Sequence, residues 1–385
     1  MTAGPLLAAS LTRDPVQVAG LMVAQQLAWM LFALPSGALV DRIDRRFAMT
    51  AAAVFRMVAL LTLGGVVLMG EVPLLLLYGV FFLVGCAGLL YENAATVLLP
   101  AIVPTNRLAT ANGRLLAART LCQSMIAAPL AGWLFGLADW SPFVFDAAAL
   151  VAVAALSMTL PTSRPAPGTE HASLRAAIGE GLRWLTHHRI LRTVTITVAV
   201  SNVGLGAALS IMVLIAYERL GLDSVGYGLL LAATAVGGIA GGLLANRVFV
   251  RLGPGTVLRV GMVVEALVHV GLALAGDAIA MGVILAMLGL HLMIFSTVCA
   301  TLRQELVPTE LLGRVHSAYR MGSNAGMLLG ALSGGVMGRY FGLAAPFWLG
   351  FAGVVLVTVL VWRVLDNTDI EAARQAVTRG STVSR

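Results

Sequence analysis

The chain has 385 residues, of which 59% are hydrophobic and only 11% are charged, with a mean hydropathy of +0.92 and a formal net charge of +7. This composition predicts a multi-pass membrane protein and argues against a soluble enzyme. No residue is Lys, so the chain lacks both the phosphate-binding Lys of an ATP-binding loop and a Schiff-base Lys. The three Cys residues do not have the spacing of metal ligands.

Eleven apolar segments are each long enough to cross a bilayer as a helix. They are approximately 16–40, 48–69, 72–97, 110–137, 142–160, 191–216, 225–249, 256–276, 278–302, 312–340 and 344–364. Arg residues outside these spans concentrate on one side, while the opposite loops carry only Arg13, Arg219 and Arg339. The positive-inside rule accounts for the positive net charge, so a nucleic-acid partner is not needed to explain it. The same rule places the C-terminus in the cytoplasm.

An internal repeat predicts two parallel halves. Gly37-x-Leu-x-Asp41-Arg42 recurs as Gly242-x-Leu-x-Asn246-Arg247, and the Val-Pro-Thr of 103–105 recurs at 307–309, at nearly the same offset. The same offset places residues 1–11 at the end of a first helix whose beginning is absent, so these residues are expected to be the tail of that helix.

The expected organisation has four parts. Residues 1–160 form the first half, 161–190 a cytoplasmic linker, 191–365 the second half and 366–385 a polar cytoplasmic tail with frayed structure. Within the linker, the apolar spacing of 173–185 predicts a short amphipathic helix. This helix either lies on the lipid headgroups or simply connects the halves.

The segment that ends the first long span carries a specific resemblance. Gly37-x-Leu-x-Asp41-Arg42-x-x-Arg45-Arg46 resembles the signature between the second and third helices of the major facilitator superfamily of secondary transporters. The resemblance implies an all-α fold of twelve helices in two six-helix halves, of which eleven spans are complete here. It also implies transport by alternating access.

A second resemblance concerns the branch of that superfamily. Residues 98–112, together with Pro129 and Gly132 in the expected fifth helix, are similar to the enterobactin-exporter and macrolide-efflux branch. This similarity implies proton-driven export of a small amphipathic molecule, such as a siderophore or a drug. Two alternatives stay open: import by the same fold, and a membrane receptor or scaffold that does not transport.

Asp41 is expected to form an inner gate. A carboxylate at an inner helix end can cap the exposed N–H groups at the start of another helix, here the one that begins near 309–313. By resemblance, this contact holds the outward-facing state and breaks when the cytoplasmic side opens. The alternative is that the charges at 41–46 only set the topology.

Ionisable residues inside spans are further candidates, because charge is costly in a bilayer. Glu92, Arg56 and Arg114 lie a few turns from predicted cytoplasmic helix ends, so they form either a proton-coupling site or a static ion pair at the gate. Glu265 and His269 are one turn apart, which favours a local polar contact between helices.

Helices one, four, seven and ten line the cavity in this superfamily. The candidate lining residues are Tyr78, Phe82, Asn202, His291 and Phe295. Such a lining, aromatic and poor in charge, suits a bulky amphipathic substrate better than a sugar. The alternative is that these residues only pack, and His291 is either a hydrogen-bonded core residue or a proton carrier.

Glycine recurs at every fourth position from Gly322 to Gly338 and is expected to mark a sliding seam between the halves. The expected partners are a small-molecule substrate, protons and the lipid bilayer. No cofactor, metal, catalytic residue or nucleic acid is expected. The protein is expected to act as a monomer in a bacterial inner membrane.

Overall fold

The computed structural model describes residues 2–40, 42–70, 72–104, 107, 111, 114–115, 118–162, 174–308 and 311–383. These residues form helices and the connections between them, without a β-strand, which confirms the expected all-α class. The chain divides into two compact units. Unit 1 comprises Met1–Glu170 and Met212–Ala232, and unit 2 comprises His171–Ile211 and Ala233–Arg385.

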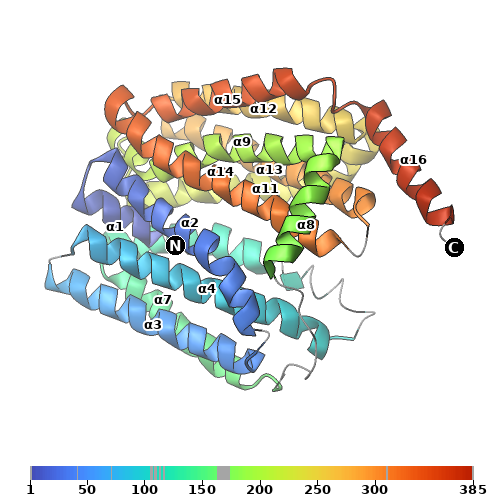
Figure 1. Cartoon of the computed structure of the whole chain (residues 1–385). Helices are drawn as coiled ribbons and strands as arrows, with labels where there is room; N and C mark the ends of the chain where they lie inside the picture. The colour runs from blue at the N-terminus through green and yellow to red at the C-terminus, as the bar shows by residue number, and fades with distance from the viewer. Residues whose placement is uncertain are drawn as a thin grey trace. The chain divides into compact units, whose positions relative to one another are not determined.

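Unit 1 is built around three long helices that lie side by side (Figure 1). Helix α3 packs against both α4 and α7, and α2 packs against α4. The helices of this unit are α1 (Ala3–Leu11), α2 (Pro15–Val40), α3 (Arg45–Met69), α4 (Leu74–Ile102), the π-helix η2 (Thr120–Ile126), α6 (Ala127–Leu137), α7 (Ser141–Met158), α10 (Met212–Leu214), the π-helix η3 (Ile215–Arg219) and the first part of α11 (Ser224–Leu252).

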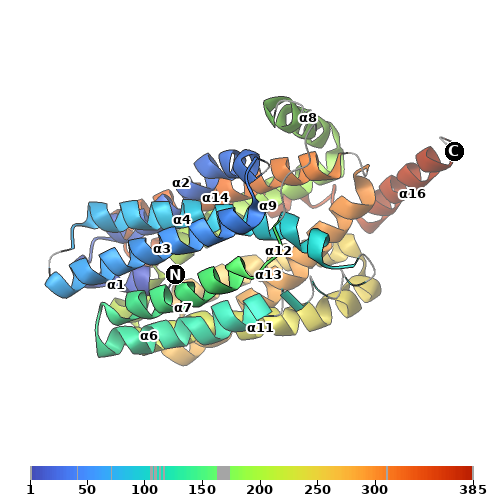
Figure 2. The same ribbon diagram turned by 90° about the horizontal axis from the view of Figure 1, so that it is seen from below.

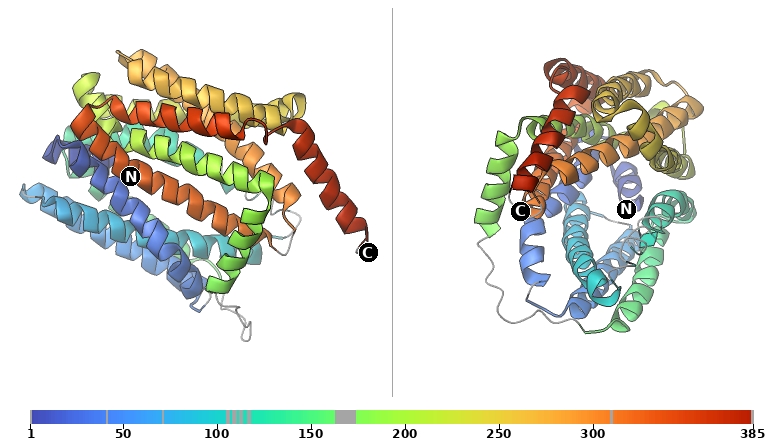
Figure 3. Two further views of the ribbon diagram at one scale, coloured as in Figure 1. Left: turned by 45° about the horizontal axis from the view of Figure 1, so that its top comes forward. Right: turned by 90° about the vertical axis from the view of Figure 1, so that its right-hand side faces the viewer.

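Unit 2 is organised around α9, which packs against α14 and α15, while α12 packs against α13 and α15 (Figure 3). Its helices are α8 (Leu174–His187), α9 (Arg189–Ser210), the rest of α11, α12 (Pro254–Leu274), α13 (Ala278–Leu306), α14 (Leu312–Phe341), α15 (Ala345–Val361) and α16 (Asn367–Val383).

The linker helix expected over 173–185 is present as α8. It runs across α14 rather than alongside it (Figure 2). Two contacts hold it there: Glu180 forms an ion pair with Arg314, and Gly181 lies against the backbone of Arg314. These contacts favour a connecting helix docked on protein, and the lipid-headgroup role stays a prediction.

Among the residues that the structure describes, eight helices are long and apolar enough to cross a membrane by length and composition. The apolar helices over Leu121–Leu137 and Ala345–Val361 are shorter. Helix α14 has 30 residues but is not among the eight. The 18 residues between Arg320 and Arg339 carry no charge but are rich in Gly and also contain Ser and Asn, which lower their mean hydropathy. These helices correspond in order to the eleven expected spans, and the start of the span 110–137 lies in part outside the described residues.

The expected seam between halves is corrected by the packing of α14. Its glycines face α9 within unit 2, and Cβ atoms at Gly326, Gly330 and Gly334 would contact the carbonyl oxygens of residues 199, 203 and 207. Close backbone approach of this kind needs residues without a side chain. The glycine stripe therefore serves packing inside one unit.

The polar tail is also corrected, because Asn367–Val383 is helical as α16. The sequence suggested a frayed end on the basis of polarity alone. The side chains that hold α16 to the rest of unit 2 are described below.

Candidate functional site

The predicted inner gate lies where α2 ends and α3 begins. Asp41 itself falls outside the described residues. Asp44 caps α3, since its carboxylate accepts hydrogen bonds from the backbone N–H groups of Arg46 at 2.9 Å and Phe47 at 3.4 Å. The Arg46 guanidinium donates to the Leu160 carbonyl at 3.3 Å, which ties the start of α3 to the end of α7.

The other motif residues are placed as follows. Arg42 is exposed, Arg45 occupies the first position of α3, and a Cβ at Gly37 would meet no atom within 4 Å. In the second copy of the motif, Gly242, Asn246 and Arg247 are exposed on α11. The gating role of either copy stays a prediction.

Glu92 on α4 has an ion-pair partner that the sequence analysis did not single out. Its Oε1 lies 3.0 Å from Nη2 of Arg119, with the two side chains 37% and 46% exposed. Arg114 is exposed and has no ion-pair partner among the described residues. The Nε of Arg56 on α3 is buried, and the described part of the chain offers it no hydrogen-bond partner. The structure therefore does not bring the three predicted residues together, and it supplies Arg119 instead.

Pro129 and Gly132 lie on α6, directly after the π-helix η2. Proline has no N–H to donate to the preceding turn, which is a common setting for a locally altered helix. A Cβ at Gly132 would contact the carbonyl oxygen of Ser224, and one at Gly228 would lie 2.9 Å from Cα of Pro129. Both predicted residues thus belong to a close crossing of α6 with the start of α11 inside unit 1.

The cavity candidates of unit 1 lie on α4. The Tyr78 hydroxyl donates to the Gln17 carbonyl at 2.5 Å and its ring lies over Gly20, so Tyr78 packs against α2. Phe82 is partly buried one turn further along.

The cavity candidates of unit 2 are placed differently. The Asn202 amide donates to Oγ of Ser323 at 2.6 Å and so links α9 to α14. His291 and Phe295 are only 5% and 7% exposed, with ring centroids 5.4 Å apart. Both therefore lie in the packed interior of unit 2 in this structure, and a role in lining a cavity stays a prediction.

Glu265 and His269 are in contact, but His269 binds the backbone carbonyl of Glu265 and not its side chain. Nδ1 of His269 lies 2.9 Å from the carbonyl oxygen of Glu265. The Glu265 carboxylate instead contacts Ser201 and His291, on two other helices. Sequence spacing reveals neighbours on one helix but not contacts between helices.

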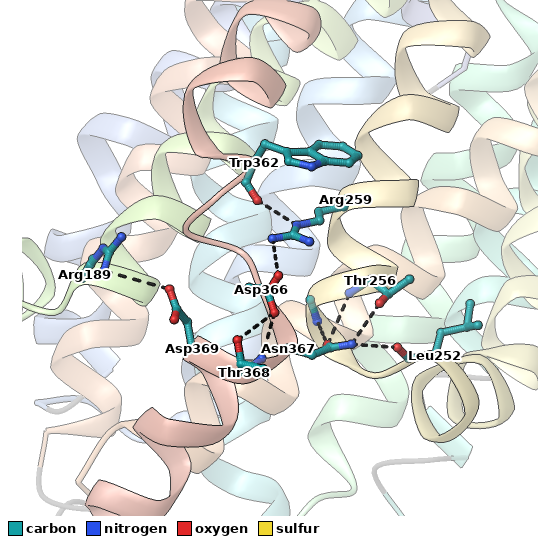
Figure 4. A network of polar contacts seen from close by, with 10 residues as sticks. Arg189, Leu252, Thr256, Arg259, Trp362, Asp366, Asn367, Thr368 and Asp369 are labelled. Atoms are coloured by element: carbon teal, nitrogen blue, oxygen red, sulfur yellow. Dashed lines mark hydrogen bonds and ion pairs between the residues drawn. The ribbon is translucent and has the colours of Figure 1, made fainter.

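The start of α16 is tied to α12 by a polar network (Figure 4). The Asn367 side-chain oxygen accepts from the Gly255 N–H at 2.7 Å, and its NH2 group donates to the Leu252 carbonyl at 3.1 Å. One amide thus satisfies an unpaired carbonyl at the end of α11 and an unpaired N–H at the start of α12.

Asp366 extends the network to Arg259, at 2.8 Å. Hydrogen bonds from Thr368 and the Arg259 guanidinium lower the pKa of Asp366 below its usual value. A carboxyl whose pKa is lower in the folded state stabilises the fold above its ordinary pKa. This contribution is lost as the pH falls through the lowered value, so the contact is retained at neutral pH.

Asn367→Ala is expected to loosen α16, because it removes the bridge between the ends of α11 and α12. Loss of a capping Asn costs about 0.5–2 kcal/mol. The measurement is the rate at which trypsin cleaves after Arg374 in the purified protein, and the expected result is faster cleavage. Asn246→Ala, at an exposed amide on α11, is the matched control. Equal cleavage rates in the two variants would contradict the anchoring role.

Comparison with known proteins identifies the family. Residues 2–379 match the family model MFS_3, described as "Transmembrane secretion effector", and the chain belongs to this family of the major facilitator superfamily. The family and the similar solved structures are membrane transporters rather than enzymes. The chain is therefore a multi-pass membrane transporter with the major facilitator fold. No curated protein sequence matches it.

Three solved structures illustrate the shared fold. The nucleoside transporter NupG matches with a TM-score of 0.71 and 14% identity over 94% of this chain and 93% of that chain. A POT family transporter in complex with 5-aminolevulinic acid matches with a TM-score of 0.74 and 10% identity over 90% and 87%. A bacterial homologue of the iron transporter ferroportin, in the inward-facing state, matches with a TM-score of 0.65 and 17% identity over 94% of both chains.

Proposed function

We propose that the protein exports a small amphipathic compound across a bacterial inner membrane, with its C-terminus in the cytoplasm. The observation that carries the direction is the family itself, whose description is transmembrane secretion effector and whose model matches residues 2–379. The resemblance of residues 98–112 and of Pro129 to the enterobactin-exporter and macrolide-efflux branch supports export of a siderophore or drug-like molecule.

The proposed mechanism is alternating access driven by the proton gradient in antiport. Asp41 and the Arg residues that follow it close the cytoplasmic side, and this contact breaks when that side opens. The low charge of the spans favours a substrate bound mainly by apolar and aromatic contacts, because a sugar needs many hydrogen-bond partners. An amphipathic substrate of this kind also partitions into the membrane from which it is exported.

Metabolite comparison tests the direction and names the substrate class. Intracellular and medium metabolites are compared between cells that lack the protein and cells that express it. A compound retained in the deficient cells and returned to the medium on expression is the expected result. A compound that enters only the expressing cells would establish import, and no moving compound across varied growth conditions would support the non-transporting alternative.

Asp41→Asn tests the gate in the same cells. The substitution keeps the shape of the side chain and removes the charge that would cap a helix. The expected result is loss of export together with a shift toward the inward-open state, read by labelling single cysteines placed on each side of the membrane. Unchanged export and unchanged labelling would show that the charges at 41–46 only set the topology.

A further inference from the structure

A polar cluster lies inside unit 2, at the middle of three apolar helices. Glu265 on α12 is only 2% exposed. Its Oε2 accepts a hydrogen bond from Oγ of Ser201 on α9 at 3.0 Å and lies 3.4 Å from Nε2 of His291 on α13. A carboxyl group at this depth is costly unless it is paired or protonated, so its presence calls for a chemical reason.

His269 contacts the backbone of Glu265 and not its carboxylate. Its Nδ1 lies 2.9 Å from the Glu265 carbonyl, so Nδ1–H is the donor, and its buried Nε2 finds no hydrogen-bond partner among the described residues. The ring is held between Gly204 and Gly350, where added Cβ atoms would collide with it. A second proton on Nε2 would be a buried donor without an acceptor among the described residues.

In the described part of unit 2, His291 is the titratable side chain within ion-pair distance of the Glu265 carboxylate, and the buried thiol of Cys299 is near enough to sense the charge of that carboxylate. Helix α15 has no ionisable residue, and the charged residues of α9, Arg189 and Arg192, lie at its start. On α13, Cys299 lies about two turns beyond His291 and is buried, and Arg303 lies a further turn away. The pair Glu265–His291 is therefore electrically neutral when it holds a single proton, on either residue.

We propose that Glu265 and His291 form a proton-binding site that holds one exchangeable proton, with Ser201 as the residue that positions the carboxylate. The proton moves between carboxyl oxygen and imidazole nitrogen within the neutral pair and leaves to water when the pair opens. No other bond is made or broken. This site is separate from Glu92, and the inference rests on the proposed proton-driven export because it names the residues that bind the driving ion.

The link to movement lies in two consecutive residues of α9. Ser201 holds the carboxylate on α12, and Asn202 holds Ser323 on α14. A rotation or shift of α9 breaks the hydrogen bond to Glu265 and alters its preference for the ionised form. Because such coupling is reciprocal, binding or release of the proton biases the position of α9.

Infrared difference spectroscopy on the full chain in lipid vesicles tests the site without knowledge of the substrate. Spectra are recorded between about pH 5 and about pH 9, the range in which a His–carboxyl pair exchanges protons. The expected result is a carboxylic-acid band that changes with pH in the unmodified protein, disappears in Glu265→Gln and remains in the exposed control Glu218→Gln. Identical spectra for the unmodified protein and Glu265→Gln would overturn the proposal.

Ser201→Ala is a second variant that tests the site independently of whether Glu265→Gln folds. In Ser201→Ala the carboxylate loses a hydrogen-bond donor that favours its ionised form, so the carboxylic-acid band is expected to persist to higher pH. An unchanged pH dependence of that band would remove Ser201 from the site.

Comparison with export separates the two proposals. If the band titrates but no compound is exported, the proton site stands and the proposed function fails. If a compound is exported without dependence on the pH gradient and the band does not titrate, export stands and the proton site fails. In a coupled transporter, Glu265→Gln is expected to cut gradient-driven export at least about tenfold, a change in free energy of about 1.4 kcal/mol.

Discussion

Gly330→Ala is expected to lower the thermal stability of the protein, because α14 and α9 touch backbone to backbone at this position. An added Cβ would lie 2.9 Å from the backbone N of Ala207 and 3.0 Å from Cα of Gly206, and it would also contact the carbonyl oxygen of Val203. Backbone atoms cannot rotate away, so the helices must separate. Overpacking of this kind costs about 1–3 kcal/mol. The measurement is the unfolding temperature of the purified protein in detergent.

Gly322→Ala is the matched control, on the same helix and in the same four-residue series. Its Cβ would lie 3.4 Å from Cγ2 of Thr195, an ordinary distance to a side-chain methyl group. Since Ala is favoured over Gly inside a helix by roughly 0.5–1 kcal/mol, this variant is expected to be as stable as the unmodified protein or more so. Equal losses in both variants would show that backbone contact does not decide the outcome.

Arg119→Ala is expected to lower the unfolding temperature, because it removes the cation that neutralises Glu92 on α4. The Glu92–Arg119 distance of 3.0 Å is that of a direct ion pair. Coupling between residues in contact amounts to about 0.5–3 kcal/mol, and the partial exposure of both side chains places this pair in the lower part of that range. The same melting experiment measures the change.

Two further variants show whether the stability lost in Arg119→Ala comes from loss of the ion pair or simply from loss of a positive charge. Arg114→Ala removes an equal charge from a position with no ion-pair partner among the described residues and is expected to change the unfolding temperature little. Glu92→Arg combined with Arg119→Glu reverses the pair and is expected to recover most of the stability lost in Arg119→Ala. No recovery would indicate that Arg119 acts through packing alone.

Helix positions were largely predictable from the sequence. Long apolar runs correspond to α3, α4 and α13, and acidic residues cap two of these helices: Asp44 begins α3 and Asp277 begins α13. A cap depends on hydrogen bonds within three residues, so local sequence contains the required information. The spacing that predicted a helix over 173–185 is equally local, and α8 confirms it.

Contacts between helices were not predictable in the same way. Depth along the spans suggested Arg56 and Arg114 as partners of Glu92, whereas the partner is Arg119. Depth does not determine the direction in which a side chain leaves its helix. That direction depends on helix rotation, which changes by about 100° per residue. Residues 120–126 form a π-helix next to Arg119, which further alters the rotation there.

The sequence by itself determined the class of protein, since the transfer of apolar residues from water to lipid depends on composition and segment length alone. It also determined the superfamily, through the spacing of Gly37, Asp41 and Arg42 and its second copy at 242–247. Tertiary structure decided that the α14 glycines face α9, that α16 is helical and bridged to α12, and that Glu265 meets His291 rather than His269 through its carboxylate. Each of these depends on residues from different helices at one point in space, where close packing and the cost of an unpaired polar group select a single arrangement.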